Sequence, residues 1–325
     1  MTKAIRIHAP GGPEAMRWEE IAVGDPGPGE VRLRQTAVGL NYIDVYHRTG
    51  QYPLPKMPAV IGLEGAGTVE AVGAQVSDLK AGDRVAYAAP PPGAYAQARL
   101  MPADRLIKLP DAIDDRQAAA MMLQGMTVRY LIRRTYPVKK GDTVLFHAAA
   151  GGVGLIACQW LKHLGATVIG TVGSAEKAAL AKAHGCTHTI NYRTEDFAAR
   201  VREFTGGAGV PVVYDSVGKD TFEGSLKCLQ PMGLMVLFGA ASGPVPPLDL
   251  GRLAGLGSLF VTRPTLMTYT AKREDLVATA KDLFEVVTSG AVKIEIKQTY
   301  PLAEAAQAHR DLEARKTTGS TILLP

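Results

Sequence analysis

The sequence predicts an α/β protein in which a mostly β N-terminal domain precedes a doubly wound parallel sheet. Three observations predict this architecture. Short β-type runs separated by glycine and proline fill residues 1 to about 120. Helical patterns then alternate with apolar strands. An apolar strand, a glycine-rich turn and a helix follow one another over residues 142–164.

The glycine-rich turn has the pattern of an anion site. The strand Thr143–Phe146 is short and apolar, which is typical of a strand buried in a parallel sheet. Gly151, Gly152 and Gly154 carry no Cβ, so the backbone can turn sharply and approach a ligand closely. Because the helical pattern begins at Leu155, the free N–H groups of a helix N-terminus point at this turn.

The turn carries Ala148-x-x-Gly151-x-x-Gly154, a variant of the usual Gly-x-Gly-x-x-Gly. A second strand follows at Thr167–Val172, and this setting is typical of a dinucleotide fingerprint. The alternative is an ordinary strand-to-helix turn. The residues expected to hold a pyrophosphate are Ala150, Gly151, Gly152 and Val153.

The remaining elements follow from periodicity and turn residues. The predicted N-terminal strands are 3–8, 31–38, 67–72, 84–88 and 105–108. Six later strands are expected at 143–146, 167–172, 187–192, 212–215, 234–238 and 258–261, with helices at 155–164, 175–183, 195–204 and 220–229. The tail should contain a helix near 274–288 with Thr270 as its N-cap, a helix at 303–314 and a strand at 320–324.

Length and composition narrow the class of protein. A chain of 325 residues, 46% of them hydrophobic, is long enough for about two domains. Its three cysteines indicate neither a disulfide framework nor a zinc knuckle. We find no signal-peptide core or membrane-length apolar run, so we expect a cytoplasmic protein without membrane contact. The net charge of +5 is dispersed and only 6% of residues are aromatic, so we expect no nucleic-acid partner.

The end of the second strand distinguishes the nicotinamide cofactors. An NAD site places Asp or Glu there to accept from the ribose 2′-OH. Gly173, Ser174 and Lys177 instead offer room, a hydroxyl and a cation for a 2′-phosphate, so we predict NADPH. Glu176 is the one objection, but its place in a first helical turn suits the helix dipole. Tyr192 could contact the adenine ribose or its phosphate, or simply pack over a helix.

Residues 41–52 form a dense polar segment that we expect to be a loop. Polar donors beside an apolar pocket suit a carbonyl substrate. The alternative is a solvated loop whose tyrosines pack on the surface. The polar residues are Asn41, Asp44, Tyr46, His47, Arg48 and Tyr52.

These motifs resemble those of the zeta-crystallin-like quinone oxidoreductases, a zinc-free branch of the medium-chain dehydrogenase/reductase superfamily. The resemblance rests on residues 141–154 with Gln159 and Lys162, on 41–52, and on Gly62-Leu-Glu-Gly65. It implies a GroES-like catalytic domain at 1–122, a Rossmann NADPH domain at 123–265, and a return of 266–325 to the catalytic domain. It also implies metal-free hydride transfer from NADPH to a quinone, and a homodimer. Strand 258–261 is apolar and would be an exposed edge in a monomer, so we expect it to pair with its symmetry mate.

The zinc ligands of related enzymes are replaced in this sequence. Zinc-dependent relatives carry a cysteine three residues before an aspartate, and with Asp44 as the aspartate that position holds Asn41. Leu63 replaces the histidine of their Gly-His-Glu motif, and residues 82–100 lack their cysteine-rich loop. His184 and His188 could share one strand face, but neighbouring Gly185 and Cys186 suit a helix C-cap and a buried apolar residue. We therefore expect no metal.

The resemblance implies further cofactor contacts. They are Thr127 near the nicotinamide, Ser216, Phe238, Arg263, and Arg315 at the 2′-phosphate. Relatives often carry an amide where Ala240 stands, so only backbone contacts are expected there.

The expected chemistry needs little acid catalysis, because the reduced oxygen of a quinone is a phenolate with a pKa of about 10, like that of tyrosine. Tyr52 is the first choice to donate a hydrogen bond to this developing oxyanion, and Tyr46 is the second. Asn41 is a candidate amide donor or ribose contact. Two alternatives remain open: an NADPH-dependent enal or enone reductase, and a non-enzymatic RNA-binding or structural role.

Overall fold

The computed structural model describes residues 2–325, which form two compact units. Unit 1 comprises residues 2–126, 270–284 and 294–325, and unit 2 comprises 127–269 and 285–293. Met1, the first residue of the predicted N-terminal domain, lies outside the described residues. Among residues 2–325, no helix is both long and apolar enough to cross a membrane.

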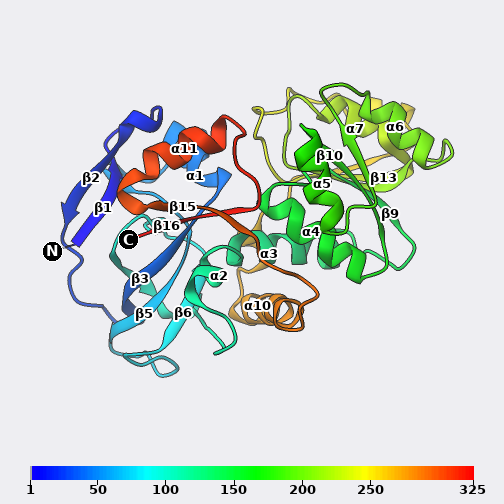
Figure 1. Cartoon of the computed structure of the whole chain (residues 1–325). Helices are drawn as coiled ribbons and strands as arrows, with labels where there is room; N and C mark the ends of the chain where they lie inside the picture. Colours follow the sequence, from blue (N-terminus) through cyan, green and yellow to red (C-terminus); the bar gives the residue numbers. More distant parts are fainter. Residues whose placement is uncertain (1) are drawn as a thin grey trace. The chain divides into compact units, whose positions relative to one another are not determined.

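Unit 1 is built mainly from β-strands (Figure 1). The strands are β1 Thr2–Ile7, β2 Met16–Ile21, β3 Glu30–Leu40, β4 Ala59–Val60, β5 Glu64–Val72, β6 Arg84–Ala88, β7 Ala98–Pro102, β8 Ile107–Lys108, β15 Ile296–Pro301 and β16 Ser320–Leu324. The larger sheet has the order β15-β16-β3-β5-β6-β8, with β7 also paired to β3, and the smaller has the order β2-β1-β4. Since β16 pairs antiparallel with β3, the end of the chain closes a sheet begun near its start.

The helices of unit 1 are short except for one in the tail. They are α1 Tyr42–Thr49, α2 Asp115–Ala119 and α11 Ala305–Glu313; α3, Met122–Tyr130, and α10, Arg273–Thr288, each continue from unit 1 into unit 2. Thr270 is not the N-cap of α10, because this helix begins three residues later. The backbone oxygen of Thr270 instead accepts a hydrogen bond from Arg105.

Unit 2 contains the predicted doubly wound sheet, which is confirmed. Its strands are β9 Thr143–Phe146, β10 Thr167–Val172, β11 His188–Asn191, β12 Val210–Asp215, β13 Leu229–Leu237 and β14 Phe260–Thr262. They run parallel in the order β11-β10-β9-β12-β13-β14. The direction of winding reverses between β9 and β12, and ligands of such sheets bind at this switch point, beyond the carboxyl ends of the strands.

Helices cover both faces of this sheet. They are α4 Gly152–His163, α5 Ala175–Ala183, α6 Phe197–Phe204 and α7 Phe222–Cys228, with the short α8 Gly251–Gly255 and α9 Leu266–Tyr269 after β13 and β14. Figure 1 shows α4 beside α5 and α6 beside α7. Val201 of α6 and Leu226 of α7 pack on Leu145 of β9 in one apolar core. Burial on both faces explains why β9 appears in the sequence as an uninterrupted apolar run.

Candidate active site

The glycine-rich turn joins β9 to α4. Its left-handed residue is Ala148, with φ 55°, whereas Gly151 has φ −79°. The glycines therefore act through their missing Cβ atoms rather than through a left-handed backbone. A Cβ on Gly154 would overlap the carbonyl oxygen of Ala148 and lie 2.7 Å from the Cα of Ala149. Only glycine at position 154 lets the helix approach the turn this closely.

Helix α4 begins at Gly152, three residues earlier than predicted. Its first intrahelical hydrogen bond runs from the N–H of Leu155 to the carbonyl of Gly151. The N–H groups of Gly152 and Val153 precede that bond, as orphan donors of a helix N-terminus do. The predicted pyrophosphate contacts therefore lie at the helix end, where the dipole favours an anion.

The end of β10 has the features that suit a phosphate. Ser174 is the N-cap of α5, and its hydroxyl accepts from the N–H of Lys177 at 3.3 Å. A Cβ on Gly173 would lie 2.7 Å from the Tyr192 hydroxyl and 3.5 Å from Nε of Arg193. The Tyr192 hydroxyl thus lies at the predicted phosphate position. Arg193, the second residue after β11, was not predicted and places a second cation beside Gly173.

Glu176, the acid that could have favoured NADH, lies in the first turn of α5. Its pKa is lowered, first by a hydrogen bond with the Ser174 side chain. The carboxylate is thus engaged at the start of its own helix, as the helix-dipole interpretation expects.

Three further predicted contacts directly follow strands of unit 2. Ser216 comes after β12, Phe238 after β13 and Arg263 after β14. A Cβ on Gly239 would lie 2.5 Å from the Ser216 carbonyl, so the turns after β12 and β13 approach closely. Arg263 donates to the Leu237 carbonyl at 2.9 Å. The structure therefore gathers these residues at one edge of the sheet.

Two predicted contacts lie elsewhere in the chain. Thr127 is buried in α3. Arg315, left-handed with φ 58°, follows α11 in unit 1. Within that unit, burial and then Glu313 raise the pKa of Tyr42, and Arg315 opposes them.

The segment predicted as a loop at 41–52 is largely helix α1, so that prediction is wrong. Asn41 is its N-cap and donates its N–H to Oδ2 of Asp44 at 2.9 Å, while Gly50 ends the helix with φ 80°. This hydrogen bond is one half of a capping box, which the sequence pattern Asn-x-x-Asp indicates. The solvated-loop alternative is also wrong, because Asp44 and Arg48 are 0% and 1% exposed.

Helix α1 brings the candidate tyrosines together. The rings of Tyr46 and Tyr52 meet edge to face with centroids 5.0 Å apart, and Tyr42 lies 5.9 Å from Tyr46. The N–H of Tyr52 donates to the Tyr46 carbonyl at 3.0 Å, which holds the residue after the helix against it. The two candidate donors are thus neighbours in one aromatic cluster.

The Asn41 side chain is held at both ends. Its Nδ2 donates to Oε2 of Glu64 at 2.6 Å, and its Oδ1 accepts from Gln124 at 3.3 Å. Glu64 also accepts from the N–H of Leu123 at 2.7 Å and is fully buried. Burial raises the pKa of Glu64 to about 8, against the lowering effect of these hydrogen bonds. Glu64 had no predicted role, although a carboxylate beside an apolar run was a signal.

A second buried network connects α1 with α11. Tyr95 donates to Oδ2 of Asp44 at 3.1 Å and lies 2.9 Å from Nε2 of His309. Arg48 lies 3.1 Å from Nδ1 of His309 and contacts both carboxylate oxygens of Glu313 at 2.8 Å. Arginine can only donate, so Nδ1 of His309 accepts and Nε2 carries the proton. Burial lowers the pKa of His309 to about 3, so the imidazole stays neutral.

The buried Asp44 predicts a change of stability with pH. Burial raises its pKa from 3.8 to about 7. A carboxyl raised in this way stabilises the fold below its unfolded pKa, and this stability is lost as pH rises through the folded pKa. From about pH 5 to about pH 8, the free energy of unfolding of the wild type should fall relative to that of Asp44→Asn by about 1–3 kcal/mol. Urea unfolding at both pH values measures this difference, and parallel profiles would contradict the burial argument.

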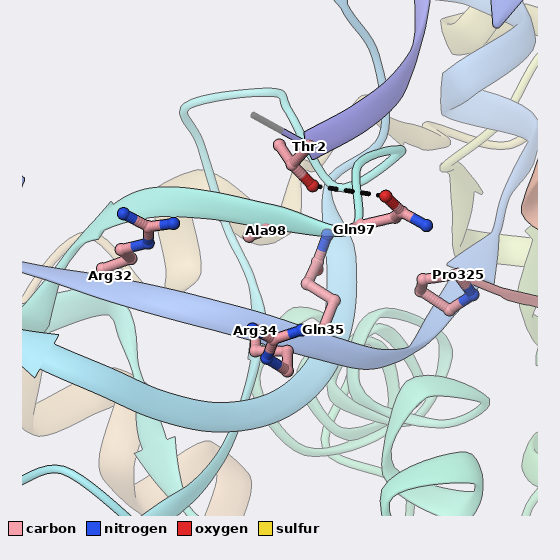
Figure 2. A pocket seen from close by; sticks show the side chains of 7 residues that line it. All are labelled: Thr2, Arg32, Arg34, Gln35, Gln97, Ala98 and Pro325. Atoms are coloured by element: carbon pink, nitrogen blue, oxygen red, sulfur yellow. Dashed lines mark hydrogen bonds between the residues drawn. The ribbon is translucent and has the colours of Figure 1, made fainter. Parts of the chain in front are cut away.

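A surface pocket of about 230 Å³ in unit 1 is separate from the predicted site residues. Figure 2 shows its lining, with the Thr2 hydroxyl directed at Gln97. Its two guanidinium groups, those of Arg32 and Arg34, both pair with Glu70. A carboxylate of this chain thus engages both guanidinium groups, so we assign no ligand to this pocket.

The structure also places the residues considered for metal binding. His184 hydrogen-bonds through Nδ1 to the Leu180 carbonyl at 2.8 Å, and His188 stacks on Phe204 with centroids 4.3 Å apart. Across residues 2–325, no group of three or more His, Cys, Asp or Glu side chains could hold a metal ion.

Comparison with known proteins adds the family. Residues 27–111 match the alcohol dehydrogenase GroES-like domain, and residues 152–284 match a family described as zinc-binding dehydrogenase. The chain is 55% identical over 325 residues to a quinone oxidoreductase of Pseudomonas aeruginosa, with both chains fully covered. The chain belongs to the quinone oxidoreductase family. The predicted resemblance and the two-domain fold are thereby confirmed.

Two other family members bear on cofactor and substrate. The crystal structure of Escherichia coli quinone oxidoreductase complexed with NADPH has a TM-score of 0.98 and 50% identity, covering 99% of this chain and 100% of that one. A 2-haloacrylate reductase from Burkholderia sp. is 51% identical over 331 residues, covering 100% of this chain and 99% of its own.

Proposed function

We propose that this protein reduces quinones with NADPH. The end of β10 supports the choice of NADPH over NADH. Gly173, Ser174 and Lys177 offer space, a hydroxyl and a cation for a 2′-phosphate, where an NADH site needs an acid. The residues present fit this cofactor. Gly152 and Val153 would hold the pyrophosphate at the start of α4, as in other doubly wound sheets.

NADPH, when bound, supplies the hydride, and this chain's residues bind, orient and stabilise charge. We propose that the hydroxyl of Tyr52 donates a hydrogen bond to the developing quinone oxyanion, with Tyr46 as the second choice for this role. The reduced oxygen of a quinone is a phenolate, which a hydrogen bond from a tyrosine hydroxyl can stabilise without a stronger acid. Asn41 is proposed as an amide contact, and its anchoring by Glu64 and Gln124 would fix its orientation.

The tyrosine roles predict a specific kinetic result. Tyr52→Phe should lower kcat with a quinone by about tenfold or more, as loss of one oxyanion donor does, and leave NADPH affinity unchanged. Tyr46→Phe should have a smaller effect. Steady-state kinetics with a cofactor titration measures both parameters. Unchanged rates in both variants would remove the phenols from the mechanism.

A second candidate activity is reduction of an activated alkene, and the likeness to 2-haloacrylate reductase favours it. The same cofactor site would serve either acceptor. A panel of 1,4-benzoquinones and enones with NADPH separates them: quinones should show the higher kcat/KM, and a preference for enones would replace the first proposal.

Zinc is not part of this proposal. The positions of the zinc ligands in zinc-dependent relatives hold Asn41 and Leu63, and a leucine side chain cannot ligate zinc. The protein would therefore position and polarise the acceptor by hydrogen bonding alone.

We also propose a homodimer and a cytoplasmic location. Strand β14 ends the sheet of unit 2, with Phe260 and Val261 60% and 37% exposed, and such an apolar edge favours pairing. A monomer by light scattering would contradict this pairing. The three cysteines form no disulfide, which suits a reducing compartment.

A further inference from the structure

We infer that a buried chain of hydrogen bonds centred on His147 sets the geometry of two turns that hold the cofactor, with His147 as a positioning residue. The inference rests on the proposed function, since it takes these turns as the NADPH site. His147, Asp215 and Ser225 are 0% exposed and Thr171 is 1% exposed. These groups lie beneath the carboxyl edge of the sheet of unit 2.

The chain is continuous from β10 to β12. Nδ1 of His147 lies 2.9 Å from the Thr171 hydroxyl, and Nε2 lies 2.9 Å from the Ser225 hydroxyl. Ser225 in turn donates to Oδ2 of Asp215 at 3.2 Å, an oxygen that also accepts from Thr221 at 2.7 Å. Each buried polar group named here therefore has a partner, as a buried network requires.

The direction of every bond follows from Asp215. Its carboxylate oxygens only accept, so the hydroxyl proton of Ser225 is committed to it. The Ser225 oxygen must then accept from Nε2–H of His147, and Nδ1 of His147 must accept from Thr171. Burial lowers the pKa of His147, with Asp215 acting in the opposite direction, so the imidazole keeps one donor and one acceptor.

Both ends of the chain reach the backbone of cofactor turns. At one end the Thr171 hydroxyl lies 3.4 Å from the N–H of Ala148, the left-handed residue of the glycine-rich turn. At the other end, Oδ1 of Asp215 accepts from the N–H groups of Val217 and Gly218 at 2.7 and 3.0 Å. These residues directly follow Ser216.

The network thus connects the turns after β9 and β12 through a residue of β10. Strands β9 and β12 are neighbours at the switch point. Small displacements of the backbone N–H donors there would weaken the binding of a phosphate. The same side-chain types form hydrolytic triads, but zero exposure of His147, Asp215 and Ser225 leaves a substrate no access. Positioning of the turns is the role that their location supports.

The test is direct titration of NADPH into folded variants, with melting temperature as a parallel readout. Thr171→Val keeps the shape and removes the hydroxyl, and Thr171→Ser keeps the hydroxyl. Thr187→Val is the control for loss of a threonine hydroxyl away from the cofactor turns: this residue is exposed, and its hydroxyl accepts from the N–H of Val168 at 3.2 Å, near the amino ends of β10 and β11. Ser225→Ala interrupts the chain at a second point.

Thr171→Val and Ser225→Ala should each raise the Kd for NADPH about fivefold or more, the usual cost of one unsatisfied buried partner. Thr171→Ser and Thr187→Val should stay within about twofold of the wild type. The double variant should lose less than the product of the single losses, because both act on one chain.

A folded Thr171→Val with wild-type affinity, or an equal loss in Thr187→Val, would overturn the inference while the proposed function stands. A wild type that binds no NADPH would overturn both. If the variants do not fold, nitrogen NMR of wild-type His147 decides: a proton on Nε2 supports the chain, and a proton on Nδ1 overturns it.

Discussion

Replacing Gly154 with alanine should weaken NADPH binding by about a hundredfold. The added Cβ would overlap the Ala148 carbonyl oxygen and lie 2.7 Å from both the Cα and the carbonyl carbon of Ala149. All three neighbours are backbone atoms, so no side chain can rotate away. The turn must open at a cost of about 3 kcal/mol, typical of severe overpacking, and opening displaces the donors proposed for the pyrophosphate. Calorimetric titration of NADPH measures the loss.

Gly255→Ala is the matched control in the same unit. No atom lies within 4 Å of a Cβ built at Gly255, so this variant should bind NADPH like the wild type. Wild-type affinity in a folded Gly154→Ala protein would mean that the turn does not hold the cofactor.

Replacing Arg48 with methionine should destabilise unit 1 by about 1–3 kcal/mol, the usual cost of leaving a buried polar partner without its hydrogen bond. Arg48 is 1% exposed and contacts Glu313, His309 and the Gly11 carbonyl. Methionine fills similar space but leaves His309 Nδ1 and the Gly11 oxygen unsatisfied in the interior. Urea unfolding and the melting temperature report the effect.

Arg252→Met makes the same substitution in an exposed pair. Arg252 bonds to both carboxylate oxygens of Glu223, but the two side chains are 45% and 60% exposed. Solvent already screens such a pair, so stability should hardly change. Equal losses in Arg48→Met and Arg252→Met would show that burial of the α1–α11 network is not what stabilises unit 1.

The sheet of unit 2 was predictable because its strands are buried on both faces. The bounds of β9, β10 and α5 agree with prediction, since apolar runs and a Ser N-cap mark them directly. Strands β2 and β15 were missed because charged and polar residues interrupt them, and their pairing with β1 and β16 is what makes them strands. Such strands are defined by partners elsewhere in the chain.

The sequence predicts which candidate site residues follow the strand ends, but not the buried hydrogen-bond networks that hold them. The polar residues of α1 predict a solvent-exposed loop, yet their partners lie far along the chain: Tyr95 for Asp44, and Glu313 for Arg48. His147 was passed over for the same reason, since Thr171 and Ser225 satisfy it only in the folded sheet. Hydrogen bonds between buried polar groups that are distant in the chain produce no periodic pattern in the sequence, so a single sequence does not reveal them.

The most direct test of the account is steady-state oxidation of NADPH and NADH, side by side, with a 1,4-benzoquinone as acceptor and with or without a chelator. Oxidation should depend on the quinone, and kcat/KM for NADPH should exceed that for NADH by about tenfold or more, the usual contribution of charge-assisted hydrogen bonds to a phosphate. The chelator should change nothing. Equal rates with the two cofactors, loss of activity on chelation, or no oxidation with the quinone would contradict it.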